Sequence, residues 1–287
     1  MKYSVGILLS AASSVVAQSA PVIGKGQTGP LKVGYFEEPG LPKHTVYMPI
    51  DPPAGTKLPI LIWGNGACSG NGTLFGKTLL ESASYGIFSI AMGTPKGGSS
   101  TSGMNSDKSP LQEQALEWIE KNAGVGKYAN LDKTRVAAAG QSCGGLETIR
   151  VWEHPLVKLI GVFNSGELNV SKLTLKITKP VFYFLGGESD IAYKNGERDY
   201  KQLPATTPRW KGNLPVGHMA TWSQVNSGKF GKAMRLWLDW QLRGNEESSD
   251  FFLKGGAKAD GWTVEMAAME SLPKVTPIQS CKVGTAC

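Results

Sequence analysis

A serine between glycines is the feature of this sequence with the clearest chemical use. Ser142 lies in Gly140-Gln-Ser-Cys-Gly144, after a short apolar run at 135–139 and before a segment with helical spacing. A strand, a G-x-S-x-G turn and a helix in this order are typical of a nucleophile elbow, a strained turn that exposes a serine hydroxyl above a sheet. Glycines at both ends remove side chains that would collide with the adjoining strand and helix. The pattern predicts Ser142 as a nucleophile.

A serine nucleophile needs a general base, and near neutral pH that base is usually histidine. The chain has three histidines, His44, His154 and His218. His44 precedes the first predicted core strand. His154 follows the helix after the serine, which would carry it away from the hydroxyl. His218 lies in a late loop, where a side chain can reach over the carboxyl ends of the strands, so it is the predicted base.

A third group should orient the imidazole and stabilise its positive charge during the reaction. Asp190 follows the apolar segment that ends at Leu185 and is the preferred acid. Glu188 on the same loop and Glu167 after the preceding strand are the alternatives. All three are placed after predicted strands, where the loops should approach Ser142.

An oxyanion hole requires two backbone N–H groups that point at the developing negative charge. One predicted donor is the N–H of Cys143, directly after the nucleophile. The other is the N–H of Ala67 in Gly64-Asn-Gly-Ala-Cys68, a glycine-rich turn that follows an apolar strand as the serine does. Its two glycines would let the backbone come close to a substrate.

Three large side chains near these positions are candidate walls of a substrate pocket: Trp63, Met219 and Trp222. For Trp63, which ends an apolar strand, packing in the core is the favoured interpretation. No group of His, Cys and Asp has the spacing of metal ligands, so no metal is expected.

Apolar runs alternate with amphipathic segments along most of the chain. The predicted strands are almost uniformly apolar, which is typical of parallel strands buried on both faces. The sequence therefore predicts one α/β domain, with a mainly parallel, twisted sheet covered by helices on both faces. The predicted strands span 45–50, 58–63, 86–92, 135–139, 159–163 and 180–185, and the predicted helices 75–85, 111–122, 145–153 and 230–242.

With these residues in place, the sequence resembles the secreted α/β-hydrolases of the esterase, cutinase-like and polyester-hydrolase kind. The similarity runs from about Thr45 to Leu242 and rests on Asn65-Gly-Ala, Gly140-Gln-Ser-Cys-Gly-Gly145, Asp190-Ile-Ala192 and His218. In that family a Pro-Gly-aromatic or similar turn supplies an oxyanion donor, and Asn65-Gly-Ala takes its place here. The family often has Met or Gln after the serine, where this chain has Cys143. The resemblance implies hydrolysis of carboxylic esters, small or polymeric, without a cofactor.

Two other classes of function are compatible with the same residues. One is a hydrolase-fold protein that binds a ligand or the cell wall without turnover, although an intact serine, histidine and acid favour catalysis. The other is an amidase or acyltransferase that uses the same triad. A Cys143 nucleophile, as in relatives of dienelactone hydrolase, is disfavoured because Gln141 rather than glycine lies two positions before it.

Four cysteines in an exported chain predict two disulfides, for which three pairings exist. Cys281 and Cys287 lie close together near the carboxyl end and are expected to staple the tail. That leaves Cys68 and Cys143, which are adjacent to or part of the predicted oxyanion hole. Two separate buried thiols are the alternative for this second pair.

The amino-terminal residues 1–17 have a basic start and a short apolar run, which predicts a signal peptide and a secreted, extracellular protein. Residues 18–44 are expected to form an extended lead-in, and residues 45–287 the folded domain with its stapled tail. Asn71-Gly-Thr73 and Asn169-Val-Ser171 are acceptor sequences for N-glycans in an exported chain.

The bulk composition excludes several classes of protein. Of 287 residues, 41% are hydrophobic and 18% charged, which is ordinary for a globular protein. The net charge of +7 comes from scattered basic residues, without the charge runs of a nucleic-acid-binding module. After the leader no segment is long and apolar enough to enter a membrane stably. A monomer that acts on an ester substrate is the expectation.

Overall fold

The computed structural model describes residues 19–98, 108–169 and 172–278. The predicted signal peptide and the two tail cysteines, Cys281 and Cys287, lie outside these ranges. The strands are β1 (Val22–Ile23), β2 (Val33–Phe36), β3 (His44–Pro49), β4 (Leu58–Gly64), β5 (Phe88–Met92), β6 (Leu131–Gln141), β7 (Val157–Phe163), β8 (Val181–Leu185), β9 (Arg209–Asn213) and β10 (Thr263–Ala267).

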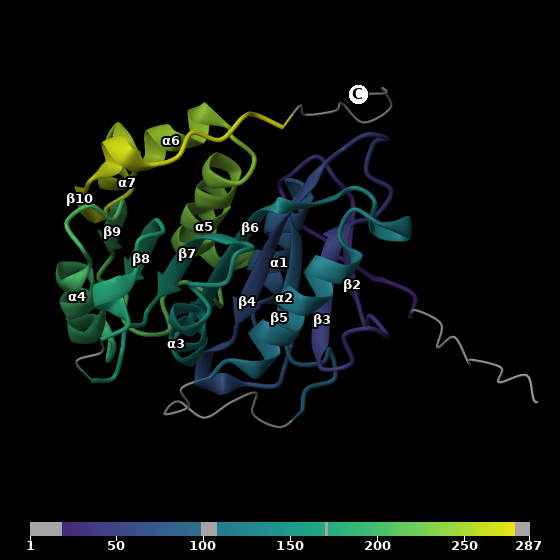
Figure 1. The fold of residues 1–287 in the computed structure, drawn as a ribbon, viewed down its shortest axis with the longest axis horizontal. Coiled ribbons are helices and arrows are strands. Elements are labelled where there is room, and N and C mark those ends of the chain that lie inside the picture. The colour runs from purple at the N-terminus through teal and green to yellow at the C-terminus, as the bar shows by residue number, and fades with distance from the viewer. Residues whose placement is uncertain (1–18, 99–107, 170–171, 279–287) are drawn as a thin grey trace, which may run out of the picture.

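All ten strands belong to one sheet, with the order β1-β2-β3-β5-β4-β6-β7-β8-β9-β10 (Figure 1). The six strands from β5 to β9 in this order are parallel to one another. The strands at each end of the sheet pair antiparallel. The prediction of an α/β protein with a mostly parallel sheet is therefore confirmed.

Helices cover both faces of the sheet, because side chains that alternate along each central strand enter two separate cores. In β4, Ile60 and Ile62 join one core, and Leu61 and Trp63 join the other. Helices α2, α3 and α4 cover the first core, and α1, α5, α6 and α7 the second. The helices are α1 (Gly76–Ser84), α2 (Pro110–Asn122), α3 (Cys143–Arg150), α4 (Tyr193–Gln202), α5 (Gly228–Gln241), α6 (Glu246–Leu253) and α7 (Gly256–Ala259).

Every predicted strand and helix is found, with ends displaced by a few residues. Four strands and three helices were not predicted: β1, β2, β9, β10, α4, α6 and α7. The segment 18–44, expected to be an extended lead-in, forms the antiparallel pair β1–β2 and joins the sheet through β3. Most of these elements lack a long apolar run, since they lie toward the sheet edges or cover its ends, and β2 has only the four residues Val33–Phe36.

The parallel centre of the sheet brings the site together. Loops that follow the carboxyl ends of adjacent parallel strands must lie side by side at one edge of the sheet. In spatial order, the loops after β4, β6, β7, β8 and β9 contain Ala67, Ser142, Asn164, Asp190 and His218. Residues up to 151 positions apart in the chain (67 and 218) thus meet at this edge.

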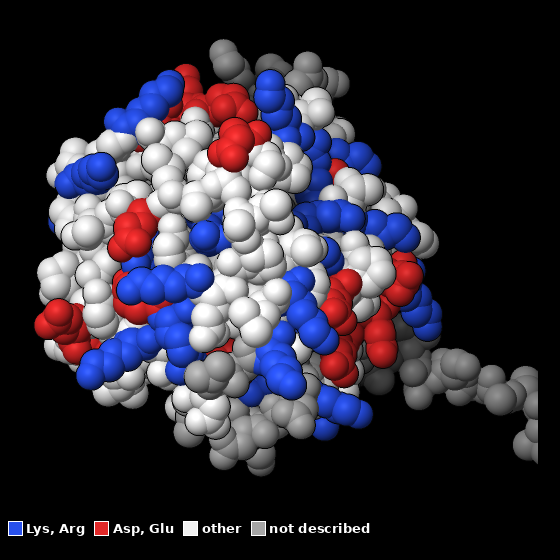
Figure 2. Space-filling model, turned by 60° about the vertical axis from the view of Figure 1, so that its left-hand side comes forward, with Lys and Arg blue, Asp and Glu red and all other residues white. Residues whose placement is uncertain are grey.

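Charge is mixed on the face of the molecule in Figure 2, where Lys and Arg side chains alternate with Asp, Glu and uncharged groups. Part of the positive charge is paired, as where Lys211 lies 2.6 Å from Glu197 and 2.7 Å from Glu265. In the portion of the chain that the structure covers, no helix combines the length and the apolar composition needed to cross a bilayer.

Candidate active site

Ser142 occupies a sharp turn between β6 and α3. Its backbone has φ 53° and ψ −118°, an unfavourable conformation for a residue with a side chain. Glycine packing makes this turn feasible. A Cβ on Gly144 would lie 2.0 Å from the carbonyl oxygen of Gly64, and a Cβ on Gly140 would lie 2.3 Å from the carbonyl of Gly144. A Cβ on Gly64 would in turn lie 2.6 Å from the Cα of Gly144. The close approach of β4, β6 and α3 therefore requires glycine at positions 64, 140 and 144.

Ser142, His218 and Asp190 form a continuous chain of hydrogen bonds. His218 Nε2 lies 2.9 Å from Ser142 Oγ, and His218 Nδ1 lies 2.6 Å from Asp190 Oδ1. An ionised carboxylate can only accept, so Nδ1 carries the proton and donates it to Asp190. The lone pair of Nε2 then faces the serine hydroxyl, which donates to it. This is the tautomer that a general base needs.

Asp190 is buried, and polar donors surround its carboxylate. Oδ1 also accepts from the Ala192 N–H at 2.9 Å, while Oδ2 accepts from Asn164 Nδ2 at 2.9 Å and from the Gly186 N–H at 3.1 Å. Burial by itself raises the pKa of Asp190, but the hydrogen bonds from His218, Asn164 and Ala192 outweigh it and leave the pKa below its usual value. Asp190 is therefore ionised at neutral pH.

The alternative bases and acids lie elsewhere. His44 is buried on β3, where its Nε2 donates to the Leu111 carbonyl at 2.9 Å, and burial lowers its pKa to about 4. His154 lies after α3, and its Nδ1 accepts from the Leu156 N–H at 3.3 Å. Glu188 is exposed on the loop of Asp190.

Glu167 also lies away from the imidazole of His218. Its backbone N–H donates to Asp199 Oδ2, and its carbonyl accepts from Arg198 of α4. Of the three acids considered from the sequence, the structure brings only Asp190 to His218.

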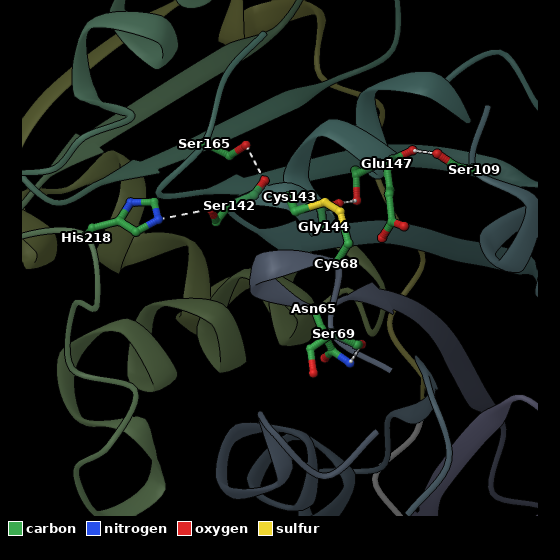
Figure 3. Close-up of a disulfide and its surroundings, with 11 residues drawn as sticks. Asn65, Cys68, Ser69, Ser109, Ser142, Cys143, Gly144, Glu147, Ser165 and His218 are labelled. Atoms are coloured by element: carbon green, nitrogen blue, oxygen red, sulfur yellow. Dashed lines mark hydrogen bonds between the residues drawn. A yellow bond between two sulfur atoms is a disulfide. The ribbon is translucent and has the colours of Figure 1, made fainter. Parts of the chain in front are cut away.

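A disulfide joins the two loops that carry the predicted oxyanion donors. Cys68 and Cys143 are bonded, with their Cα atoms 5.2 Å apart, and the close-up in Figure 3 shows this bridge beside Ser142. Ala67 has a positive φ of 54°, and Cys143 begins α3, so neither N–H lies inside a regular ladder. Among the described residues, the backbone hydrogen bonds outside helices and strands include none from either N–H. Both N–H groups therefore remain candidate donors to a ligand at Ser142.

The side chain of Asn65 holds the loop that carries Ala67. Its buried Nδ2 lies 3.0 Å, 2.9 Å and 2.6 Å from the carbonyl oxygens of Ser69, Asn71 and Met92, respectively. These contacts tie the loop to itself and to the end of β5. The Asn65 amide and the Cys68–Cys143 disulfide therefore both hold the loop that carries Ala67.

Three supporting residues were not identified from the sequence: Gln141, Asn164 and Ser165. Gln141 Nε2 donates to the carbonyl of His218 at 3.1 Å, and Ser165 Oγ donates to the carbonyl of Ser142 at 2.6 Å (Figure 3). The signal was present, because each is a polar residue at the end of a buried parallel strand. Only the strand order shows which loops they connect.

The candidate pocket walls separate into two groups. Trp63 is fully buried and packs against Phe75, Phe163 and Trp222, with ring centroids 5.1 to 5.9 Å apart. Trp222 is also part of this core, so both tryptophans support the site from beneath. Met219, beside His218, is 71% exposed and is the only one of the three predicted wall residues on the surface.

The two glycan acceptor positions differ in environment. Asn169 is exposed, whereas Asn71 is half-buried and its Oδ1 accepts hydrogen bonds from the Thr73 N–H at 3.0 Å and hydroxyl at 2.8 Å. An N-glycan is attached through Nδ2, so both contacts of Oδ1 are compatible with a glycan on Asn71.

No protein-family model matches the sequence, and no curated protein matches it either. Within the described ranges, no three His, Cys, Asp or Glu side chains are grouped so as to hold a metal ion. A hydroxyl faces a basic nitrogen, the imidazole is hydrogen-bonded to a carboxylate, and a disulfide joins the two loops that carry the candidate N–H donors. Such a set can transfer an acyl group.

Proposed function

We propose that this protein is a serine hydrolase of the α/β-hydrolase fold that cleaves carboxylic esters through an acyl-enzyme on Ser142. The observation that carries the proposal is the hydrogen-bonded chain from Ser142 through His218 to Asp190, with the serine on a strained strand-to-helix turn. Structural serines rarely combine a positive φ with a bond to an imidazole that a buried carboxylate orients.

The arrangement of the sheet supports the same fold. The nucleophile follows a central parallel strand, and the acid and the base follow later strands in the order serine, aspartate, histidine. One oxyanion donor follows the serine and the other lies after the neighbouring strand β4. The resemblance to cutinase-like esterases rests on these same residues and is part of the proposal.

The first half of the reaction forms the acyl-enzyme. His218 Nε2 removes the hydroxyl proton as Ser142 Oγ attacks the ester carbonyl, and the carbonyl oxygen becomes an oxyanion. The N–H groups of Ala67 and Cys143 stabilise this charge. As the tetrahedral intermediate collapses, the imidazolium gives its proton to the alkoxide, and an alcohol leaves.

The second half releases the acid. His218 takes a proton from a water molecule, which attacks the acyl carbonyl and forms a second oxyanion in the same place. Collapse breaks the bond to Ser142 Oγ, which regains the proton from His218. Asp190 stays ionised throughout and stabilises the imidazolium in both halves.

We place this activity outside the cell. The Cys68–Cys143 disulfide lies at the centre of the site, and such bonds persist in oxidising compartments. The apolar leader predicted at residues 1–17 supports export.

Labelling with an organophosphonate probe tests the proposal. The wild type should be labelled once, at Ser142, and should hydrolyse p-nitrophenyl esters. Ser142→Ala should abolish labelling, and both Ser142→Ala and His218→Ala should lower kcat roughly 10³-fold or more. Ser189→Ala is the matched control, because Ser189 is exposed on the neighbouring loop of Asp190 and should leave both readouts unchanged.

A panel of substrates with matched acyl groups then separates the reactions that share this triad. Esters should be cleaved faster than the corresponding amides, and a series of acyl lengths, with feruloyl and polyester substrates, defines the preference. Labelling of Ser142 with turnover of amides alone would replace the esterase by an amidase. Absence of labelling in a folded wild type would contradict catalysis and favour a binding protein.

A further inference from the structure

Asn164 lies in the middle one of the five loops that follow the carboxyl ends of the parallel strands and contain the proposed catalytic residues. It follows β7, the strand between those that precede Ser142 and Asp190, and its side chain is completely buried. Its φ of 45° is a left-handed conformation that asparagine tolerates better than most residues. A buried polar side chain in this conformation needs partners, and its partners belong to the catalytic loops.

Each polar atom of the Asn164 amide has a partner. One Nδ2 hydrogen is directed at Asp190 Oδ2 at 2.9 Å, and Nδ2 also lies 3.4 Å from the carbonyl of Gly217, the residue before His218. Oδ1 accepts from Trp222 Nε1 at 3.3 Å. Because an indole N–H can only donate, this contact assigns oxygen to the Trp222 side and NH₂ to the Asp190 side.

We propose that Asn164 is a positioning residue of the active site, which holds the carboxylate of Asp190 in place and keeps it in register with the His218 loop. The inference rests on the proposed function. Asp190 Oδ1 is used by His218 and Ala192, so Oδ2 must be held separately to prevent rotation of the carboxylate. Asn164 supplies the side-chain donor for that oxygen, and the Gly186 N–H the backbone donor.

The donor has an electrostatic consequence as well as a steric one. A hydrogen bond to a buried carboxylate favours its ionised form. The Asn164 donor therefore lowers the pKa of Asp190 and counteracts the increase that burial causes. His218 is the titratable group that is hydrogen-bonded to Asp190 from the opposite loop, and it becomes charged when it accepts the serine proton. Loss of the amide donor should weaken the ability of Asp190 to stabilise the imidazolium, and so should act on kcat more than on KM.

Two substitutions separate positioning from a purely structural role. Asn164→Gly accepts the positive φ and removes the donor, and we expect kcat to fall about 10- to 100-fold, the range for losing a hydrogen bond to a charged group, with KM nearly unchanged. Asn164→Asp keeps the shape, and while the introduced carboxyl group is protonated it can still donate to Asp190. As the pH rises that proton is lost, and two adjacent carboxylates then repel each other.

Asn164→Asp should therefore show a falling alkaline limb in kcat that neither the wild type nor Asn164→Gly has. Thermal unfolding at each pH serves as the reference for the folded fraction. A structural role alone would lower activity only in parallel with that fraction. If Asn164→Gly does not fold, the pH profile of Asn164→Asp still decides.

The outcomes distinguish this proposal from the proposed function. Wild-type kcat in folded Asn164→Gly, or a wild-type pH profile in Asn164→Asp, would overturn the positioning role and leave the esterase assignment intact. A wild type that neither hydrolyses esters nor is labelled at Ser142 would overturn both.

Discussion

The loops around Ser142 and Ala67 are joined by a disulfide in addition to close backbone packing, whereas the contacts described between the loops of Asp190 and His218 are noncovalent, with hydrogen bonds to the carboxylate and the close approach of Gly186 to Gly217. In the first region, the nucleophile half, glycines at 64, 140 and 144 touch backbone to backbone, and Cys68 is bonded to Cys143. In the second, the acid–base half, side-chain amides and backbone N–H groups hold the carboxylate and the loop of His218.

This difference predicts different sensitivities. Steric packing and a covalent bond do not depend on the protonation of side chains, but they leave no room for an added methyl group. Hydrogen bonds tolerate small displacements, but they fail when one donor is lost or one acceptor gains a proton. Substitutions in each half should therefore have distinguishable consequences.

Apart from substitutions of Ser142 and His218 themselves, the largest effect is expected from the acid. Asp190→Asn keeps the shape but presents an amide to His218, which stabilises the wrong tautomer, so kcat should fall roughly 10³-fold. Steady-state kinetics on a p-nitrophenyl ester measure it. Glu188→Gln, on the same loop but exposed, is the control and should retain activity. Full activity of Asp190→Asn with an inactive Glu167→Gln would move the acid to Glu167.

Loss of the disulfide should affect both stability and turnover. The bridge closes a loop with a sequence separation of 75, so Cys68→Ala/Cys143→Ala should lower the free energy of unfolding by about 4 kcal/mol. Turnover should fall about 10-fold, because the two N–H donors lose their common tether.

The double variant also controls for the cysteines of the tail. Chemical denaturation and ester hydrolysis are measured with and without a thiol reductant, which should impair the wild type more than the double variant, whose remaining response is that of Cys281 and Cys287. Alkylation of Cys68 or Cys143 as a free thiol in the oxidised, folded protein would contradict the bridge.

A single methyl group in the glycine contact should destabilise the nucleophile half. Gly144→Ala places a Cβ 2.0 Å from the Gly64 carbonyl oxygen, where two backbones must move apart, at a cost of about 3 kcal/mol in unfolding free energy. Gly98→Ala is the control, since the nearest atom to its Cβ among the described residues is 3.7 Å away. Equal denaturation midpoints for the two variants would show that the contact is not tight in solution.

A smaller, pH-dependent effect on stability is expected from His44, which belongs to neither half. Burial lowers its pKa to about 4, whereas an unfolded histidine titrates near 6.5. As the pH falls through this window, the unfolded chain takes up a proton that the folded protein does not, so stability is lost. The expected loss between pH 7.5 and 5 is about 2 kcal/mol.

The variant His44→Gln isolates this contribution. Its amide can still donate to the Leu111 carbonyl but does not titrate, so the slope of unfolding free energy against pH should flatten. The difference between the slopes of the wild type and His44→Gln gives the stability lost through protonation of His44. Any remaining loss of activity at low pH then belongs to the acid–base half. An unchanged slope would show that His44 is protonated in the folded protein.

Local chemistry determined much of this protein from the sequence alone. The apolar runs of β4, β6, β7 and β8 are continuous because these strands are buried on both faces, so their positions could be predicted without a structure. The turn around Ser142 could be predicted for the same reason. Its glycines and serine lie within five consecutive residues.

Strands and helices that depend on distant partners could not be predicted in this way. In β9, Lys211 is buried, which an apolar pattern would never indicate, because Glu197 of α4 and Glu265 of β10 neutralise it. Helix α4 itself is polar along most of its length and buries few residues. Strand β9 and helix α4 can be recognised only from the structure, where the ion pairs of Lys211 are seen.

Tertiary structure also decided among the residues that the sequence left open. Asp190, Glu188 and Glu167 are chemically similar and all follow strands, but only the placement of β8 between β7 and β9 brings Asp190 to His218. The partner of Cys68 was likewise set by the contact of the β4 loop with α3. Asn164 carried no motif, because its importance depends on contacts with residues 26 to 58 positions away. Local sequence determines turns and apolar strands because the interacting residues are neighbours in the chain. Contacts between distant residues depend on the order of the strands in the folded sheet.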